Sequence, residues 1–132
     1  MTRCTLHMLV LLGGAILWSP SAFSQQSDCF ESARTNQEMN RCGETIIFPL
    51  EKKVSAEFAR LEQNFGANQE MLEILRLAQN NWNGYRNVQC MLEGTAAAGG
   101  RTQKPLPIEA SRVFMRCVFR TLNEMYVSIS KL

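Results

Sequence analysis

Glutamates and cysteines are the side chains of this sequence whose number and spacing could support chemistry. The chain has 132 residues but one histidine, His7, and one aspartate, Asp28. A histidine base, a Ser-His-Asp triad or a histidine-ligated metal therefore has almost no residues from which to be built. Two glutamates would suffice for glycoside hydrolysis, but no motif distinguishes any pair from the glutamates of an ordinary helix surface. We therefore expect no catalytic residues, no enzyme activity and no cofactor.

The first 24 residues have the three parts of a secretory signal peptide. Arg3 lies in a short basic start, an apolar run covers residues 8–18, and small side chains precede an expected cleavage site after Ser24. The run is well short of the ~20 residues that a membrane-spanning helix needs. We therefore expect residues 1–24 to be removed, with no integral membrane segment left, and residues 25–132 to form a single periplasmic or secreted domain.

Cysteine is expected to cross-link the exported chain. Cys4 lies in the leader, which leaves Cys29, Cys42, Cys90 and Cys117. An even number of cysteines in a small exported domain predicts two disulfides. The spacings contain no Cys-x2-Cys pair of the kind that binds zinc, so we expect no metal site.

A capping box begins the first expected helix. Thr35 and Glu38 have the spacing at which each side chain accepts a hydrogen bond from the backbone of the other residue. Apolar residues then recur at helical intervals as far as Phe65. Pro49 interrupts this pattern, so we expect a kink or a short break between Gly43 and Pro49.

Two more helices follow in the sequence. Asn68 is suited to cap the second, which should run to about Leu92, and a third apolar stripe begins at Ile108. Residues 94–107 between them have no periodicity and are expected to form a long loop. These elements predict an all-α fold: a small antiparallel helical bundle of three main helices, cross-linked by two disulfides.

If the first two helices form an antiparallel hairpin, the positions of the cysteines along it indicate which of them can pair. Cys42 and Cys90 lie at similar distances before and after the turn at residues 66–68. This favours a disulfide between Cys42 and Cys90, which leaves Cys29 to pair with Cys117. Local pairing, Cys29 with Cys42 and Cys90 with Cys117, stays open because residues 29–34 could fold back.

Charge is divided unevenly along a chain that is nearly neutral in total. Residues 25–75 contain nine acidic and five basic side chains, and residues 76–132 contain three and eight. Near neutrality argues against nucleic-acid binding. Carboxylates of the first half could attract a cationic protein, basic residues of the second half could bind anionic envelope polymer or lipid, or the two halves could pair with each other. The candidate partner-binding residues are Glu44, Glu51, Glu57, Glu62, Arg101 and Lys104.

Trp82, Tyr85 and Arg86 lie within about one helical turn. Aromatic and arginine side chains are frequent anchors of protein interfaces. Trp82 and Tyr85 nevertheless continue the apolar stripe of the second helix, so we expect both in the core. Arg86 is then expected to cap or pair at the edge of the bundle.

The order of these motifs resembles the lysozyme-inhibitor LprI N-terminal family. The matching stretches are Thr35-x-x-Glu38-Met39-Asn40-x-Cys42, Ala78-Gln79-x-x-Trp82-x-x-Tyr85-Arg86-x-x-x-Cys90, the pair Gly99-Gly100, and Cys117. The resemblance implies a small exported helical domain that binds and blocks lysozyme or another cell-wall hydrolase, without chemistry of its own. We expect the motif residues to be structural: Thr35, Glu38, Asn40, Gln79, Trp82, Tyr85 and Arg86.

Two alternative functions stay open at this point. One is an envelope interaction protein, such as an immunity-like protein, with a different protein partner. The other is a binder of anionic envelope polymer or lipid. For the inhibitor, the contact is expected in the loop of residues 94–107 or on the acidic first helix.

Overall fold

The computed structural model describes residues 28–102 and 104–132, and the expected signal peptide of residues 1–24 lies outside them. The described residues form helices and turns and contain no strand, so the all-α prediction is confirmed. After a helical turn at residues 28–32, the elements are α2 (Asn36–Cys42), the π-helical turn η1 (Gly43–Ile47), α3 (Phe48–Asn64), α4 (Gln69–Ala97) and α5 (Ile108–Ile129).

The predicted capping box begins α2. The Thr35 hydroxyl accepts a hydrogen bond from the Glu38 N–H at 3.2 Å. The Glu38 carboxylate accepts from the N–H groups of Arg34 at 2.7 Å and Thr35 at 3.1 Å. These backbone donors hold the pKa of Glu38 below its ordinary value, and the Arg34 N–H has the largest effect.

The irregularity expected before Pro49 is present, but the chain does not leave the helix there. The five residues of η1 form one π-helical turn, which the Phe48 N–H ends by donating to the Gly43 carbonyl. Pro49 then lies in the first turn of α3, where a helix tolerates the missing N–H. The backbone therefore changes from π-helical to α-helical hydrogen bonding just before the proline, and the helix continues through it.

The second helix is longer than predicted. Asn68 caps α4 through a hydrogen bond from the Met71 N–H, but α4 continues past Leu92 to Ala97. Residues 94–97 of the expected loop are therefore helical, and the loop is shorter, at residues 98–107. The helix ends before Gly99 and Gly100, which have positive φ angles of 67° and 80° that favour glycine.

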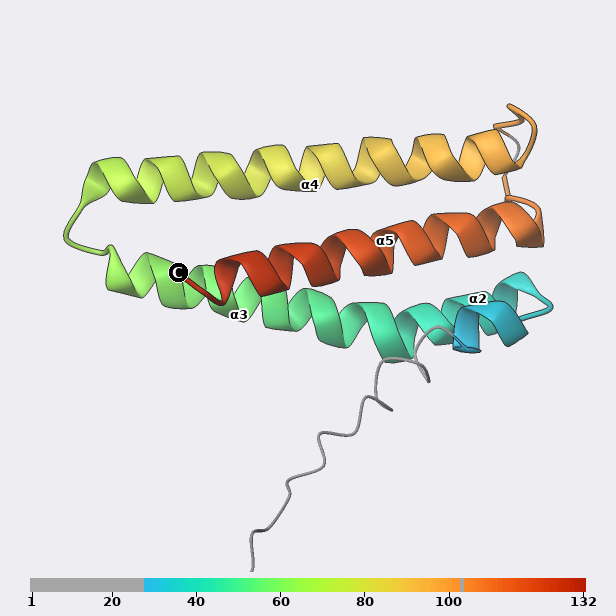
Figure 1. Cartoon of the computed structure of the whole chain (residues 1–132), viewed down its shortest axis with the longest axis horizontal. Helices are drawn as coiled ribbons and strands as arrows, with labels where there is room; N and C mark the ends of the chain where they lie inside the picture. The colour runs from blue at the N-terminus through green and yellow to red at the C-terminus, as the bar shows by residue number, and fades with distance from the viewer. Residues whose placement is uncertain (1–27, 103) are drawn as a thin grey trace, which may run out of the picture.

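The position of α5 decides the architecture. Figure 1 shows α5 running between α4 and the continuous α2–η1–α3 segment for much of its length. Accordingly, α4 packs mainly on α5, and contacts between α3 and α4 are few. Gly94 permits this close packing, since a Cβ there would lie 3.1 Å from the Phe114 Cβ and 3.3 Å from the Ala110 carbonyl oxygen.

The disulfide pairing favoured from the sequence is wrong. Cys29 pairs with Cys42, and Cys90 pairs with Cys117. In a simple two-helix hairpin Cys42 and Cys90 would lie at the same level, but α5 lies between these helices and brings Cys117 to Cys90 instead. The local alternative, in which the residues before α2 fold back, is the one observed.

Contacts with α5 explain why the segment before α2 folds back. Phe30 is fully buried, and its ring centroid lies 6.4 Å from that of Phe119. The Arg112 guanidinium donates to the carbonyl oxygens of Phe30 at 2.9 Å and Ala33 at 3.0 Å. These contacts hold Cys29 beside the end of α2, where Cys42 lies.

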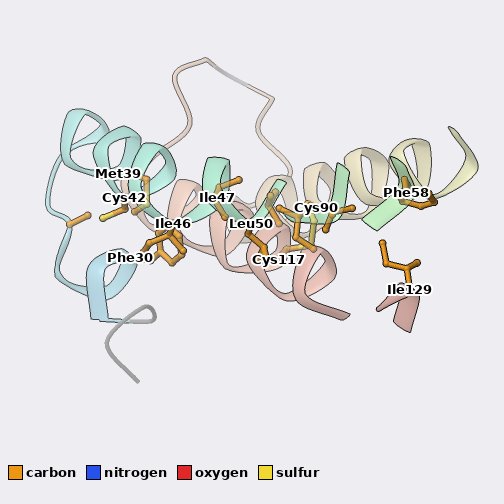
Figure 2. Close-up of a cluster of buried hydrophobic side chains, with 14 of the residues drawn as sticks. Phe30, Met39, Cys42, Ile46, Ile47, Leu50, Phe58, Cys90, Cys117 and Ile129 are labelled. Carbon is orange, nitrogen blue, oxygen red and sulfur yellow. A yellow bond between two sulfur atoms is a disulfide. The ribbon is translucent and has the colours of Figure 1, made fainter. Parts of the chain in front are cut away.

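The core extends along the whole bundle. Figure 2 shows its side chains following one another from Phe30 and Met39 at one end, past the Cys90–Cys117 pair, to Phe58 and Ile129 at the other. Cys90 and Cys117 are both almost completely buried. The second disulfide is therefore part of the hydrophobic core as well as a cross-link between α4 and α5.

Candidate functional site

A groove lies between α4 and the segment formed by η1 and the start of α3. The elements η1 and α3 form one wall, α4 forms the other, and side chains of α5 form the floor. We call it the Phe48 groove, and its volume is about 380 Å³. Its lining residues are Asn40, Gly43, Glu44, Ile47, Phe48, Glu51, Arg86, Asn87, Phe114, Met115 and Val118.

Phe48 is the exposed aromatic side chain of this groove. It follows η1 directly, and 55% of its surface is accessible. Single π-helical turns within α-helices are frequent at functional sites. The change of helical pattern takes Phe48 off the buried stripe of Ile46, Leu50 and Val54, so its ring is available to a partner.

An ion pair joins the two walls of the groove. The Arg86 Nη1 lies 3.2 Å from the Glu51 Oε1, and the Arg86 guanidinium lies 5.1 Å from the centroid of the Trp82 ring. The two charged residues line both the Phe48 groove and a smaller hollow of about 170 Å³, which Gln79 and Trp82 also line. The ion pair therefore separates the two hollows.

The candidate carboxylates do not form one acidic surface. Glu44 and Glu51 line the Phe48 groove, and Glu44 is exposed with no ion pair among the described residues. Glu57 pairs with Arg60 at 2.7 Å, and Glu62 pairs with Arg76 at 3.4 Å. Three of the four glutamates are thus paired within the chain, and Glu44 is the one that can attract a partner's cation.

The two basic candidates lie on the loop of residues 98–107 and are exposed. Lys104 lines a hollow of about 330 Å³ that shares Asn40, Phe114 and Met115 with the Phe48 groove. Arg101 lines neither hollow. The structure therefore brings Lys104, but not Arg101, to the end of the groove.

The arginines of α5 are occupied within the chain. Arg112 binds the backbone before α2, Arg116 pairs with Glu31 at 2.7 Å, and Arg120 pairs with Glu93 at 2.7 Å. A hydrogen bond from Gln89, together with Arg120, lowers the pKa of Glu93. These arginines act mainly in holding elements together.

The motif residues differ in their surroundings. Thr35 and Glu38 form the cap described above, Gln79 and Trp82 are half-buried, and Arg86 pairs with Glu51. Asn40 is exposed and lines the groove. Tyr85 has 61% of its surface accessible, so the prediction that it lies in the core is wrong.

Phe48, Asn87 and Met115 line the groove but were not among the site residues predicted from the sequence. Phe48 did carry a signal, since it is an aromatic residue that does not fit the helical spacing of the apolar stripe around it. Met115 carried none, because its packing against Gly43 of η1 joins residues far apart in the sequence.

The described residues contain no group of three histidine, cysteine or acidic side chains that could hold a metal ion. None of the described helices is both long enough and apolar enough to span a membrane. What they present instead is a disulfide-linked helical scaffold with a groove that has an apolar floor and an exposed aromatic side chain at its wall. Such features are typical of a small protein-binding domain of an oxidising, extracytoplasmic compartment.

The family model described as lysozyme inhibitor LprI matches residues 28–128. The chain therefore belongs to the LprI lysozyme inhibitor family, and the resemblance seen in its motifs is confirmed. Membership of this family supports the role of a lysozyme-inhibitor-like binding protein. The family consists of inhibitors and not of enzymes. No curated protein and no solved structure matches the chain.

Proposed function

We propose that this protein is a stoichiometric inhibitor of a lysozyme-type cell-wall hydrolase, acting in the periplasm or outside the cell after removal of residues 1–24. The Phe48 groove is its contact surface. The observation that carries this proposal is the exposed Phe48 ring beside the Glu44 carboxylate, which has no ion pair among the described residues, in a chain of the LprI family.

The groove has the composition of a protein interface. The centres of interfaces are enriched in aromatic residues and methionine, and their rims are polar. Phe48, Phe114 and Met115 supply the apolar part, while Glu44 and Asn87 supply polar groups. Burial of one aromatic anchor in a partner's pocket is the type of contact that dominates binding energy.

Charge supports a basic partner. Glu44 has no ion pair within the described part of the chain, so its carboxylate is available to a lysine or arginine of the hydrolase. Charges at the rim of an interface act mainly on the association rate and are screened by salt. Binding through Glu44 should therefore be faster at low ionic strength.

The test measures how fast lysozyme clears a bacterial cell-wall suspension while increasing amounts of this protein are added. The unaltered protein should abolish clearing near one equivalent. Phe48→Ala should weaken inhibition about 10-fold or more, as for an anchor residue. Val127→Ala is the matched control, since Val127 is an exposed apolar residue of α5 outside the groove.

Glu44→Gln tests the charge in the same assay, with Glu124→Gln, an exposed glutamate of α5, as its control. We expect Glu44→Gln to remove most of the salt dependence and Glu124→Gln to leave it unchanged. Equal inhibition by all four variants would show that the groove is not the contact. No inhibition by the unaltered protein would favour a different protein partner, such as that of an immunity-like protein.

Binding of anionic polymer or lipid has less support. It would need the basic residues of the second half to be free, but Arg112, Arg116 and Arg120 are all engaged within the chain. Arg101 and Lys104 on the loop are the basic candidates that remain.

A further inference from the structure

The outer face of α4 carries exposed apolar side chains, and the last of them, Met91, also lines the hollow beside Lys104. Ile74, Leu77, Val88 and Met91 have 52%, 59%, 71% and 44% of their surfaces accessible. Asn81 and Gly84 are exposed between them, and a Cβ on Gly84 would meet nothing within 4 Å. We call these six residues the α4 stripe.

The α4 stripe has the spacing of a helix–helix contact. Its members follow one another at intervals of three and four residues, which is the heptad repeat of a helix that packs along another helix. At 1.5 Å per residue the stripe is about 27 Å long. Tyr85 and Leu92, exposed at 61% and 62%, widen it along one side.

The stripe also lacks charge. Between Ile74 and Met91 the charged residues are Arg76 and Arg86, and both pair with glutamates of α3, Glu62 and Glu51. A solvated helix face normally carries charged side chains. A contiguous exposed apolar patch instead marks an interaction surface.

We propose that the α4 stripe binds a second copy of this chain in an antiparallel arrangement about a twofold axis. An interface of this kind must be complementary to itself, so that residue i meets residue j and j meets i. The stripe meets this condition: Ile74 would face Met91 of the second copy, Leu77 would face Val88, and Asn81 would face Gly84.

The absence of charge favours a second copy as the occupant. A charged face would place like charges opposite each other near the twofold axis, whereas this face brings no charge near its own image. Gly84 at the centre lets the two helices approach closely, because it adds no side chain between them. None of the six stripe residues lines the Phe48 groove, so this inference goes beyond the proposed inhibition and does not depend on it.

To test the dimer, the full chain is expressed and the mass of the protein in solution is measured by sedimentation equilibrium. The unaltered protein should have twice the mass of one chain at micromolar concentration. Leu77→Glu should weaken the dimer about 10-fold or more, because a carboxylate would be buried against Val88. Val127→Glu is the matched control, with an exposed valine on α5, and should not change the mass.

A second variant tests the antiparallel register. In the double variant Leu77→Glu/Val88→Lys, each introduced carboxylate would meet the introduced ammonium group of the other copy, once on each side of the axis. The dimer should therefore recover at low salt. A parallel pair would instead place like charges opposite each other.

Circular dichroism checks that each variant stays helical. A monomeric unaltered protein, an equal effect of Val127→Glu, or no recovery in the double variant would overturn the proposal, whatever the outcome of the lysozyme assay.

Discussion

Glu51 of α3 and Arg86 of α4 form an ion pair across the Phe48 groove, with 3.2 Å between Oε1 and Nη1. The Arg86 side chain is 15% exposed and also lies over the Trp82 ring. Apart from the exposed Glu62–Arg76 pair, α3 and α4 contact each other little, so the Glu51–Arg86 pair is a principal link between the two walls of the groove.

We expect this pair to contribute modestly to stability. A cycle of Glu51→Ala, Arg86→Ala and the double variant should give a coupling of about 0.5–1 kcal/mol, because Glu51 remains partly solvated. Arg86→Ala should cost about 0.5–1 kcal/mol more than Glu51→Ala, since it also removes the contact with Trp82. Urea unfolding measures each value, and strictly additive single variants would contradict the link.

The two disulfides should each contribute a large share of the stability. Their sequence separations of 13 and 27 residues correspond to about 3 kcal/mol and about 3.5 kcal/mol of loop-closure entropy. Replacing Cys90 and Cys117 by alanine should cost more than replacing Cys29 and Cys42, because both sulfurs of the former pair lie in the core. Thermal unfolding of the two double variants tests this order, and the reverse order would contradict it.

Gly94 and Gly84 should respond in opposite ways to alanine. Gly94→Ala places a Cβ 3.3 Å from the backbone oxygen of Ala110, so α5 must shift slightly away from α4, at a cost of about 1–3 kcal/mol. Gly84→Ala meets no atom and should stabilise the helix by up to about 1 kcal/mol. The free energies of unfolding of the two variants are compared by urea unfolding at a protein concentration low enough to keep the chain monomeric. Similar effects of both substitutions would contradict the close packing at Gly94.

The cap of α2 should make stability depend on pH. Thr35→Ala should cost about 1 kcal/mol at neutral pH, the usual value for a lost N-cap. Glu38 has a lowered pKa in the folded protein because the Arg34 and Thr35 N–H groups donate to its carboxylate. Its stabilisation is therefore present above the ordinary glutamate pKa of about 4.3 and is lost as the pH falls through the lower, folded value.

Glu38→Gln isolates this ionisation, since the amide oxygen still accepts hydrogen bonds but carries no charge. The unaltered protein should have the higher Tm at neutral pH, and the difference should shrink below about pH 4.3. A Tm difference that stays constant across the acid range would show that the charge of Glu38 adds nothing to the cap.

Local features of the fold could be predicted from the sequence alone. The caps at Thr35 and Asn68, the irregular turn before Pro49 and the start of α5 at Ile108 all depend on contacts within about one helical turn. The extension of α4 to Ala97 was missed because the expected loop was placed at Gly94, which is a packing contact and not a helix end.

The remaining features depend on α5, and periodicity along the chain contains no information about its position. By lying between α3 and α4, it pairs Cys117 with Cys90, provides the floor of the Phe48 groove, and leaves Tyr85 and the α4 stripe exposed. The sequence by itself thus determined which residues form helices and which family the motifs resemble. Only the tertiary structure decided which helix faces meet, because that choice rests on contacts between residues far apart in the chain.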